Sequence, residues 1–332
     1  MPEPRPAARP LIVDTDGGVD DAAALWWALG DPRVDVVAIS IVWGNVDLGV
    51  AAGAVLRVLA AAGRTDIPVA LGEAGPIGPA PDLRPATFIH GDDGLGNARY
   101  PLAEGIVAVD EPAADLLRRL VHARPGEISL VTIGPLSTIG RLVSDDSTFA
   151  ADIDELVVMG GSARKGGNAL PAGEANVAHD PVGAHNVVNA AWRKPPLLVG
   201  LDVTHQATLT EAEFALLAEH RSPAASFLDQ PLRFYREFGS TMTAPDCPCH
   251  DLLAVMALVE PDVIPDAPVL PLGVDCGEGA AWGSTVVDFR APFFDELDGA
   301  DQSRPEGFAD WRIALVADAE SFRASTRALF GG

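Results

Sequence analysis

The stretch from Leu11 to Asp21, LIVDTDGGVDD, most strongly limits what this chain can fold into. Its three apolar residues, Leu11-Ile12-Val13, are typical of a short buried strand, and a Gly-Gly turn follows them. The apolar run from Ala22 to Leu29 then predicts a helix. A strand that turns directly into a helix is the opening of a β-α-β unit, so this stretch favours an α/β fold.

Four acidic residues lie in the same stretch: Asp14, Asp16, Asp20 and Asp21. In an open α/β sheet, ligands bind at the carboxyl ends of the strands, where these residues fall. Carboxylates packed this closely raise one another's pKa unless a cation or hydrogen-bond donors offset the repulsion. A solvated turn that caps the helix would need only one or two acids. The four together therefore favour a metal-binding site over a simple cap.

The alternation of strand and helix continues along the chain, which predicts a mainly parallel sheet with right-handed crossovers. We expect a single domain over residues 11–332, an open Rossmann-like sheet with helices on both faces, after a disordered tail over residues 1–10. The long loop over 72–105, rich in Gly and Pro, is expected to be functional, and a second Gly-rich loop is expected over 162–178. The expected strands are 34–42, 67–71, 128–133, 155–159, 197–201, 285–289 and 313–317. The expected helices are 47–62, which Gly63 ends, 112–122, a helix after Leu136 that ends near Val143, 211–219, 224–238 and 320–330. Two further helices are expected to begin at Pro181, with Asp180 as their cap, and at His250-Asp251.

Charge and cysteine content exclude several classes of partner. The net charge is −24 and only Lys165 and Lys194 are lysines, so few residues could form a basic face for a nucleic-acid polymer or an anionic membrane. Three cysteines are too few for a disulfide scaffold and suit a reducing cytoplasm. The N-terminus lacks the apolar segment of a signal peptide, so we expect a cytoplasmic protein with small-molecule partners.

Further polar groups follow other predicted strands or open helices. Because these positions share one edge of a parallel sheet, residues far apart in sequence can converge there. Taken singly, each has a structural explanation: a turn, a buried histidine, an exposed loop residue or a helix-start acid. Aspartate, carbonyl and water oxygens favour Ca²⁺ or Mg²⁺ over zinc. The groups are Asn45, His90, the Ile133 carbonyl, Asn168, Glu174, Asn176, His250 and Asp251.

The Cys247-Pro-Cys249-His250 segment offers zinc ligands as an alternative. The Cys-X-Cys spacing is poor for zinc, and no second Cys/His pair lies near it in the sequence. The hard-oxygen site is therefore the better interpretation.

With these residues the chain resembles a known family, the inosine–uridine-preferring nucleoside hydrolases. The matching motifs run in the family's order from about residue 11 to the last predicted helix. The motif from Asp14 to Asp21, together with the distant His250-Asp251 pair, is specific to the family, whereas each remaining match alone is weak evidence. The motifs are Asp14-Thr-Asp-Gly-Gly-Val-Asp-Asp21, Gly44-Asn45, Ile89-His90-Gly91, Gly134-Pro-Leu136, Met159-Gly-Gly161, Asn168, Glu174-Ala-Asn176, Gly200-Leu-Asp-Val-Thr-His205 and His250-Asp251.

The resemblance implies hydrolysis of the N-glycosidic bond of purine or pyrimidine ribonucleosides, giving ribose and free base, with a tightly held Ca²⁺. It implies side-chain ligation by Asp16, Asp21 and Asp251 and carbonyl ligation by Ile133. Asp16 would also be the general base, oriented by Asn45, with Asp14 bracing the cluster. Substrate-binding roles are implied for Asp20 and Asn176 at the 2′- and 3′-hydroxyls and for Asn168 and Glu174 at the 5′-hydroxyl. His90 and His250 would lie on the side of the leaving base, and Met159 is a further substrate-binding residue. Members are commonly homodimers or homotetramers.

The reaction explains why such groups are needed. Carboxylates around the ribose stabilise an oxocarbenium-like transition state, and a carboxylate beside an activated water can take its proton. The leaving base needs a proton, for which His250 is the candidate because histidine normally titrates near neutrality.

Three positions depart from the family pattern. Gly17 stands where proline is usual, which loosens the turn but moves no ligand. Ile133 replaces a polar residue, without effect if only its carbonyl binds. Ala175 stands where an aromatic residue is usual, which widens the wall beside the sugar and leaves open whether the substrate is a common or a modified nucleoside.

Two other functions compete with nucleoside hydrolysis. A phosphatase of the haloacid dehalogenase type also opens on a strand followed by Asp-X-Asp-Gly. That reading leaves Asn45, Glu174 and the His250-Asp251 pair unexplained. A non-catalytic nucleoside- or sugar-binding protein is the other alternative. The helix over 224–238, with Phe234, Tyr235 and Phe238, is either part of the core or a cover over the base.

Overall fold

Strand β1 (Arg9–Thr15) lies between β2 (Val34–Ile41) and β4 (Ser129–Thr132) and pairs in parallel with both. Its side chains alternate: Leu11 and Val13 face one hydrophobic core, and Ile12 faces the other. The strand begins two residues before the predicted start. The sequence predicted a disordered tail that includes Arg9 and Pro10. That prediction is wrong for these two residues, because both pair with β2.

The computed structural model describes residues 8–102, 105–242, 246–290 and 305–331. Residues 1–7 of the predicted tail lie outside the described residues. The single domain over residues 11–332 stays a prediction. Among the described residues, no helix is both long and apolar enough to cross a membrane.

The described strands form one large sheet in the order β10-β9-β11-β6-β5-β4-β1-β2-β3. The segment from β6 to β3 is parallel throughout, whereas β9 pairs antiparallel with both β10 and β11. The fold class predicted from the sequence, a mainly parallel α/β sheet, is therefore confirmed. The remaining strands of this sheet are β3 (Val69–Leu71), β5 (Leu156–Met159), β6 (Leu197–Val199), β9 (Val269–Val274), β10 (Thr285–Val287) and β11 (Ala309–Ile313). A separate pair is formed by β7 (Thr208–Leu209) and β8 (Cys247–Pro248).

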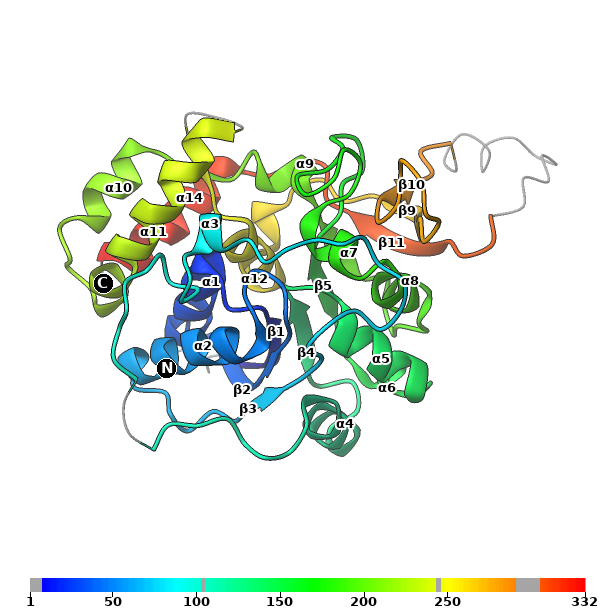
Figure 1. The fold of residues 1–332 in the computed structure, drawn as a ribbon, viewed down its shortest axis with the longest axis horizontal. Coiled ribbons are helices and arrows are strands. Elements are labelled where there is room, and N and C mark those ends of the chain that lie inside the picture. Colours follow the sequence, from blue (N-terminus) through cyan, green and yellow to red (C-terminus); the bar gives the residue numbers. More distant parts are fainter. Residues whose placement is uncertain (1–7, 103–104, 243–245, 291–304, 332) are drawn as a thin grey trace, which may run out of the picture.

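Helices cover both faces of the sheet, as predicted (Figure 1). One core packs beneath α1 (Val19–Gly30), α2 (Leu48–Ala62), α10 (Glu211–Leu217), α11 (Pro223–Met242), α12 (His250–Val259) and α14 (Ala319–Gly331). The other packs beneath α4 (Ala113–Ala123), α5 (Ser137–Asp145), α6 (Phe149–Asp152) and α8 (Pro181–Asn189). Short helices α3 (Thr87–His90), α7 (Ala175–His179) and α9 (Leu201–Thr204) and a turn of 3-10 helix (Pro261–Val263) lie in the connections.

The sequence prediction failed at the lateral edge of the sheet that β9, β10 and β11 form. Strand β9 was missed, because Pro271 and Gly273 interrupt its apolar run and proline normally argues against an interior strand. Strand β11 was placed at 313–317, but it begins at Ala309, where Trp311 is fully buried against the second core. Both errors lie far from the carboxyl end of β1.

Candidate active site

The turn after β1 is fixed by hydrogen bonds to Asp21, the third residue of α1. The Thr15 hydroxyl donates to Asp21 Oδ1, and the Gly18 backbone N–H donates to Asp21 Oδ2 at 2.8 Å. Gly17 has a left-handed φ of +72°, and a Cβ there would lie 2.6 Å from the Ala51 Cα. Proline has φ near −65°, so this turn has a conformation that the family's usual proline does not adopt.

Asn45 holds both carboxylate oxygens of Asp16. Its backbone N–H donates to Asp16 Oδ2 at 2.7 Å, and its side-chain Nδ2 donates to Asp16 Oδ1 at 3.0 Å and to Asp21 Oδ2 at 3.3 Å. Gly44 makes this approach possible, because a Cβ at that position would lie 2.1 Å from Asp16 Oδ2. Asn45 therefore orients Asp16 and links it to Asp21.

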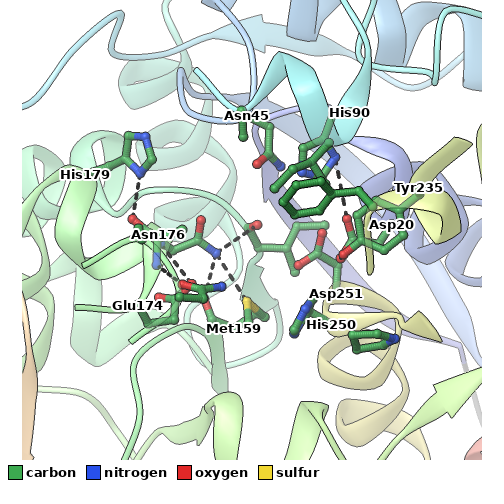
Figure 2. A pocket seen from close by; sticks show the side chains of 18 of the residues that line it. Asp20, Asn45, His90, Met159, Glu174, Asn176, His179, Tyr235, His250 and Asp251 are labelled. Carbon is green, nitrogen blue, oxygen red and sulfur yellow. Dashed lines mark hydrogen bonds and ion pairs between the residues drawn. The ribbon is translucent and has the colours of Figure 1, made fainter. Parts of the chain in front are cut away.

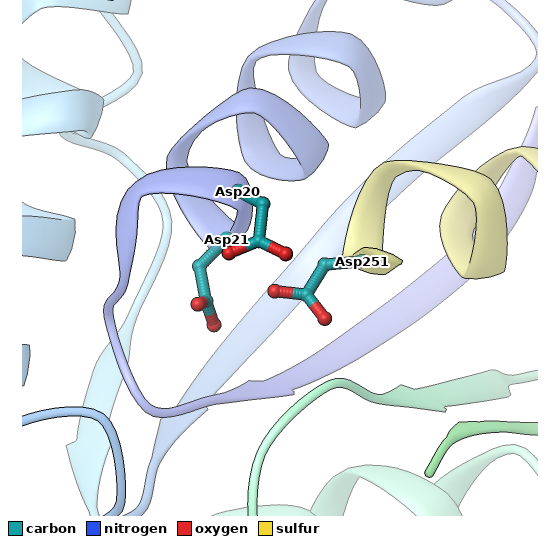
Figure 3. Close-up of side chains that lie close together, drawn as sticks. All are labelled: Asp20, Asp21 and Asp251. Atoms are coloured by element: carbon teal, nitrogen blue, oxygen red, sulfur yellow. The ribbon is translucent and has the colours of Figure 1, made fainter. Parts of the chain in front are cut away.

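Asp251, at the start of α12, meets the acids of the β1–α1 turn (Figure 3). Carboxylate oxygens of Asp20, Asp21 and Asp251 lie within 4.8 Å of one another, and all three residues are buried. Burial is the main cause that raises the pKa of Asp16 and of Asp251 well above the usual range, and it raises the pKa of Asp20 to about 7. Among the described residues, no lysine or arginine forms a salt bridge with these acids. Hydrogen bonds, and no cationic side chain among the described residues, therefore offset their charge.

Asp14 lies behind this cluster and is completely buried. Neither of its carboxylate oxygens has a hydrogen-bond partner among the described residues, and burial raises its pKa to about 7. Its side chain does not line the pocket, which is consistent with a supporting position.

The acids lie at and beneath the floor of a pocket of about 490 Å³. Asp20 and Asp251 line this pocket directly, whereas Asp14, Asp16 and Asp21 do not. Its walls come from elements far apart in the chain, including α3, α7, α11 and the start of α12 (Figure 2). Of the other site residues predicted from the sequence, the pocket is lined by Asn45, His90, Ile133, Met159, Asn168, Glu174, Asn176 and His250.

Asn176 and Glu174 stand at one side of the pocket, on the first turn of α7. The Asn176 side-chain Nδ2 donates to the backbone oxygens of Ile133 and Met159, at 3.2 and 3.1 Å. Glu174 caps α7: its carboxylate accepts from the backbone N–H groups of Gly161, Asn176 and Val177 at 2.8–3.2 Å. The Ile133 carbonyl keeps a second lone pair for another partner.

Asn168 is exposed at the rim of the same side. Its Oδ1 accepts from the Ala175 backbone N–H at 2.9 Å, so its side-chain amide is oriented with Nδ2 available as a donor. Ala175 itself lines the pocket, where the family pattern has an aromatic ring.

His90 and Tyr235 enclose Asp20 from the opposite side. The Val19 backbone N–H donates to His90 Nδ1 at 3.1 Å, and His90 Nδ1 lies 3.9 Å from Asp20 Oδ1. Burial lowers the pKa of His90 to about 4, so the ring is neutral with its proton on Nε2. The Tyr235 hydroxyl donates to Asp20 Oδ2 at 3.4 Å. Tyr235 and Phe238 both line the pocket, so α11 covers this side.

The pKa of His250 differs from the one expected from the sequence. Its Nδ1 lies 2.7 Å from the Thr204 hydroxyl, and its ring packs edge-on against His205 with centroids 5.6 Å apart. Burial, together with the neighbouring His205 and His90, lowers the pKa of His250 to about 3. A histidine that titrates near neutrality was expected, but burial keeps this ring neutral.

Among the polar and charged residues that line the pocket, sequence reasoning missed Arg84, His179 and His205. His205 ends the Gly200–His205 motif, whose position in the sequence indicates no role for the histidine. Arg84 lies in the first long loop, where nothing in the sequence distinguishes it. His179 follows the Glu174-Ala-Asn176 motif by one helical turn, and that spacing was the available signal.

Comparisons with known proteins agree with the geometry of this site. The sequence model of the family "Inosine-uridine preferring nucleoside hydrolase" matches residues 11–324. A protein of Oryza sativa subsp. japonica named "Probable uridine nucleosidase 2" is 36% identical over 259 residues, which are 77% of this chain and 76% of that protein. The "Inosine-uridine preferring nucleoside hydrolase" of Leishmania major is 35% identical over 285 residues, 86% of this chain and 89% of that one.

A solved structure described as "Plant nucleoside hydrolase - PpNRh1 enzyme" superposes with a TM-score of 0.87. It is 29% identical, and the match covers 98% of this chain and 100% of that chain. Fold, pocket and sequence thus agree over nearly the whole length, and this chain belongs to the family of inosine-uridine preferring nucleoside hydrolases.

Proposed function

We propose that this protein hydrolyses the N-glycosidic bond of ribonucleosides in the pocket above the acidic cluster, with Ca²⁺ as its metal ion. Members of its family are glycosidases that hydrolyse ribonucleosides. The observation that carries the proposal is the convergence of Asp20, Asp21 and Asp251 at and just beneath the floor of the pocket. All three are buried, and none forms a salt bridge with a lysine or arginine among the described residues.

The residues of the floor suit a hard divalent cation. Asp16, Asp21, Asp251 and the Ile133 carbonyl would hold it, because all four offer oxygen atoms, which Ca²⁺ prefers. Asp20 lies close enough to share the ion as well as to bind the sugar. When bound, such an ion would lower the pKa of a coordinated water and draw the ribose hydroxyls to it.

Asp16 is proposed to take the proton of the attacking water. Its carboxylate is held at both oxygens by Asn45, so it needs little reorganisation to act as a base. Burial and the repulsion of Asp21 raise its pKa, which makes it a stronger base than an exposed aspartate.

Asp20 and Asn176 are proposed to bind the 2′- and 3′-hydroxyls from opposite sides of the pocket. The hydrogen bonds of Asn176 to Ile133 and Met159 fix its amide, and Tyr235 contacts Asp20. Negative charge near the sugar stabilises the positive charge that develops as the glycosidic bond breaks. Asn168 and Glu174 are proposed to lie at the 5′ end of the ribose.

His250 is proposed to serve the leaving base as a neutral donor. If the Thr204 hydroxyl donates to Nδ1, the proton of the neutral ring is on Nε2, where it can be donated to a ring nitrogen of the base. His90, with its proton on Nε2, lines the same side. A cytoplasmic location and a homodimer or homotetramer remain expectations from the sequence.

One assay tests the proposed function against its alternatives. The purified protein is incubated with uridine, cytidine, inosine, adenosine and guanosine, and separately with p-nitrophenyl phosphate, each with and without a chelator. We expect release of free base that the chelator abolishes. Release of p-nitrophenol with no free base would support the phosphatase, and nucleoside binding without any base release would support the binding protein.

A further inference from the structure

The short helix α9 carries a buried carboxylate, Asp202, that stands outside the residues proposed to bind metal or substrate. Asp202 is 7% exposed and belongs to the Gly200–His205 motif. It does not line the pocket, and no lysine or arginine among the described residues forms a salt bridge with it. A carboxylate buried in this way needs hydrogen-bond donors, so its partners indicate what it does.

Asp202 receives three hydrogen bonds from the segment that follows β5. Its Oδ2 accepts from the Ala163 backbone N–H at 2.5 Å and from the Ser162 hydroxyl at 3.3 Å. Its Oδ1 accepts from the Arg164 backbone N–H at 2.9 Å. Neither backbone N–H has another hydrogen-bond partner among the residues that the structure describes. Both oxygens of Asp202 thus hold one stretch of chain, and Figure 1 shows α9 beside the loop that begins there.

Backbone contacts at Gly161 close the same joint. Its N–H donates to the Glu174 carboxylate at 2.8 Å, and its carbonyl accepts from the Leu201 N–H at 2.9 Å. Gly161 has a left-handed φ of +66°, and a Cβ on Gly200 would lie 2.8 Å from the Gly161 carbonyl oxygen. The glycine-rich end of β5 and the start of α9 are therefore fixed against each other.

The loop that starts at this joint carries Asn168 to the rim of the pocket. It turns back on itself, because the Gly167 N–H donates to the Pro171 carbonyl at 3.2 Å. Its return stem is α7, a regular element, whereas its outgoing stem, residues 162–165, contains neither strand nor helix. The position of the outgoing stem therefore depends on the side chains that contact it.

The other contacts of the outgoing stem lie at its first residue or are exposed. Thr285 Oγ1 accepts from the Ser162 N–H at 2.8 Å and donates to the Ser162 carbonyl at 2.6 Å. The Arg164 guanidinium lies over the Phe289 ring, 4.3 Å from its centroid. Arg164 is exposed, and a cation–π contact contributes least at exposed sites. Asp202 is thus the main buried support of the stem beyond its first residue.

We propose that Asp202 is a positioning residue, which holds the loop over residues 162–173 so that Asn168 meets the 5′ end of the ribose. The proposal rests on the proposed function, because it takes the 5′-hydroxyl to lie at Asn168 and Glu174. Asn168 is exposed, and its side chain has one hydrogen bond with a described residue, from the Ala175 N–H at 2.9 Å. A single bond that competes with water does not fix a loop. Without Asp202, Asn168 therefore loses its place beside the sugar.

The test compares each nucleoside that is cleaved with its 5′-deoxy analogue, using the full chain loaded with Ca²⁺. In the parent chain we expect kcat/KM to be at least about tenfold higher for the nucleoside, because its 5′-hydroxyl bonds to a charged group. Asp202→Ala should lower this preference at least about threefold, mainly through the KM of the nucleoside. Asp202→Asn, which keeps the size and one acceptor oxygen, should lower it less, and it replaces the alanine variant if that does not fold. A loss of stability alone would lower both kcat/KM values equally and leave the preference unchanged.

Asp318→Ala is the matched control. Asp318 likewise accepts from two backbone N–H groups and one serine hydroxyl, but it lies at the start of α14, outside the pocket. This variant should leave the preference for the 5′-hydroxyl unchanged. Asn168→Ala should lower the preference at least as far as Asp202→Ala. The variant that combines both changes should not go below Asn168→Ala alone, because both remove the same contact with the substrate.

Failure of this proposal is distinguishable from failure of the proposed function. An unchanged preference in Asp202→Ala, or a combined variant whose loss is the product of the two single losses, would overturn the positioning role while nucleoside cleavage stands. If no nucleoside is cleaved, calorimetry on the Ca²⁺-loaded protein decides instead. We then expect ribose to bind more tightly than 5-deoxyribose, with the difference lost in Asp202→Ala. Equal affinities in the parent chain, or a difference that the variant keeps, would reject the positioning role independently of turnover.

Discussion

Asp16→Asn is expected to lower kcat for nucleoside hydrolysis by at least about 10³-fold, the upper part of the range for loss of a general base. The amide cannot take a proton from water, and it contributes no negative charge to a bound cation. Its NH₂ group also faces a donor, because Asn45 donates to both carboxylate oxygens in the native chain. Initial rates of base release at saturating nucleoside measure the effect.

The matched control for this variant is Asp35→Asn, which makes the same change at an exposed residue of β2. It should leave kcat within about twofold of the parent chain, as is usual for surface changes. Circular dichroism checks that both variants are folded, and calcium titration separates the two roles of Asp16. Near-normal kcat in Asp16→Asn would remove Asp16 as the base.

Removing the metal ion with a chelator is expected to abolish base release and to lower the thermal unfolding midpoint. A ligand at about 1,000 times its Kd stabilises the folded state by about 4 kcal/mol. At an unfolding entropy of about 2.1 cal/mol/K per residue, a chain of 332 residues then loses about 6 °C. Differential scanning calorimetry at fixed pH, with and without chelator, measures the shift.

The pH dependence of the metal-free protein gives a second measurement. Burial raises the pKa of Asp14 and Asp20 to about 7 in the folded state, from about 3.8 in the unfolded chain. The folded state therefore binds more protons than the unfolded state between these values, and its stability falls as pH rises from about 4 to about 7. Bound Ca²⁺ should weaken this dependence, because it offsets the same charges. A metal-free protein with an unchanged midpoint and a flat pH profile would contradict a cation site at these acids.

Restoring activity after chelation identifies the ion. Calcium should restore base release more fully than zinc, because the proposed ligands are all oxygen atoms. Restoration by zinc alone would contradict the proposed ligand set.

The parallel part of the fold was predictable because its signals are local. The Leu11-Ile12-Val13 run, Asp180 with Pro181 at a helix start, and Gly63 at a helix end each specify a local conformation that the structure has. Strand β9 was not predictable in this way. Its Pro271 and Gly273 oppose a strand, and only its pairing with β10 and β11 stabilises it there.

The candidate site was predictable as a set of residues but not as an arrangement. Position at the carboxyl end of a strand, or at a helix start, indicated Asp16, Asn45 and Asp251, and the structure brings them to one place. For Tyr235 the sequence did not decide between a place in the core and a place over the base. Its contact with Asp20, 215 positions away, depends on how α11 packs over the pocket.

By itself the sequence determined the α/β class and the acids after β1, because strand periodicity, glycine turns and clustered carboxylates act over a few neighbouring residues. Only the tertiary structure decided how charges and protons are distributed among these groups. Burial keeps His250 neutral, although an exposed histidine titrates near neutrality, and it leaves His179 Nε2 without a hydrogen-bond partner among the residues that the structure describes. Both effects depend on which side chains exclude water from a group, and residues from distant parts of the chain determine that.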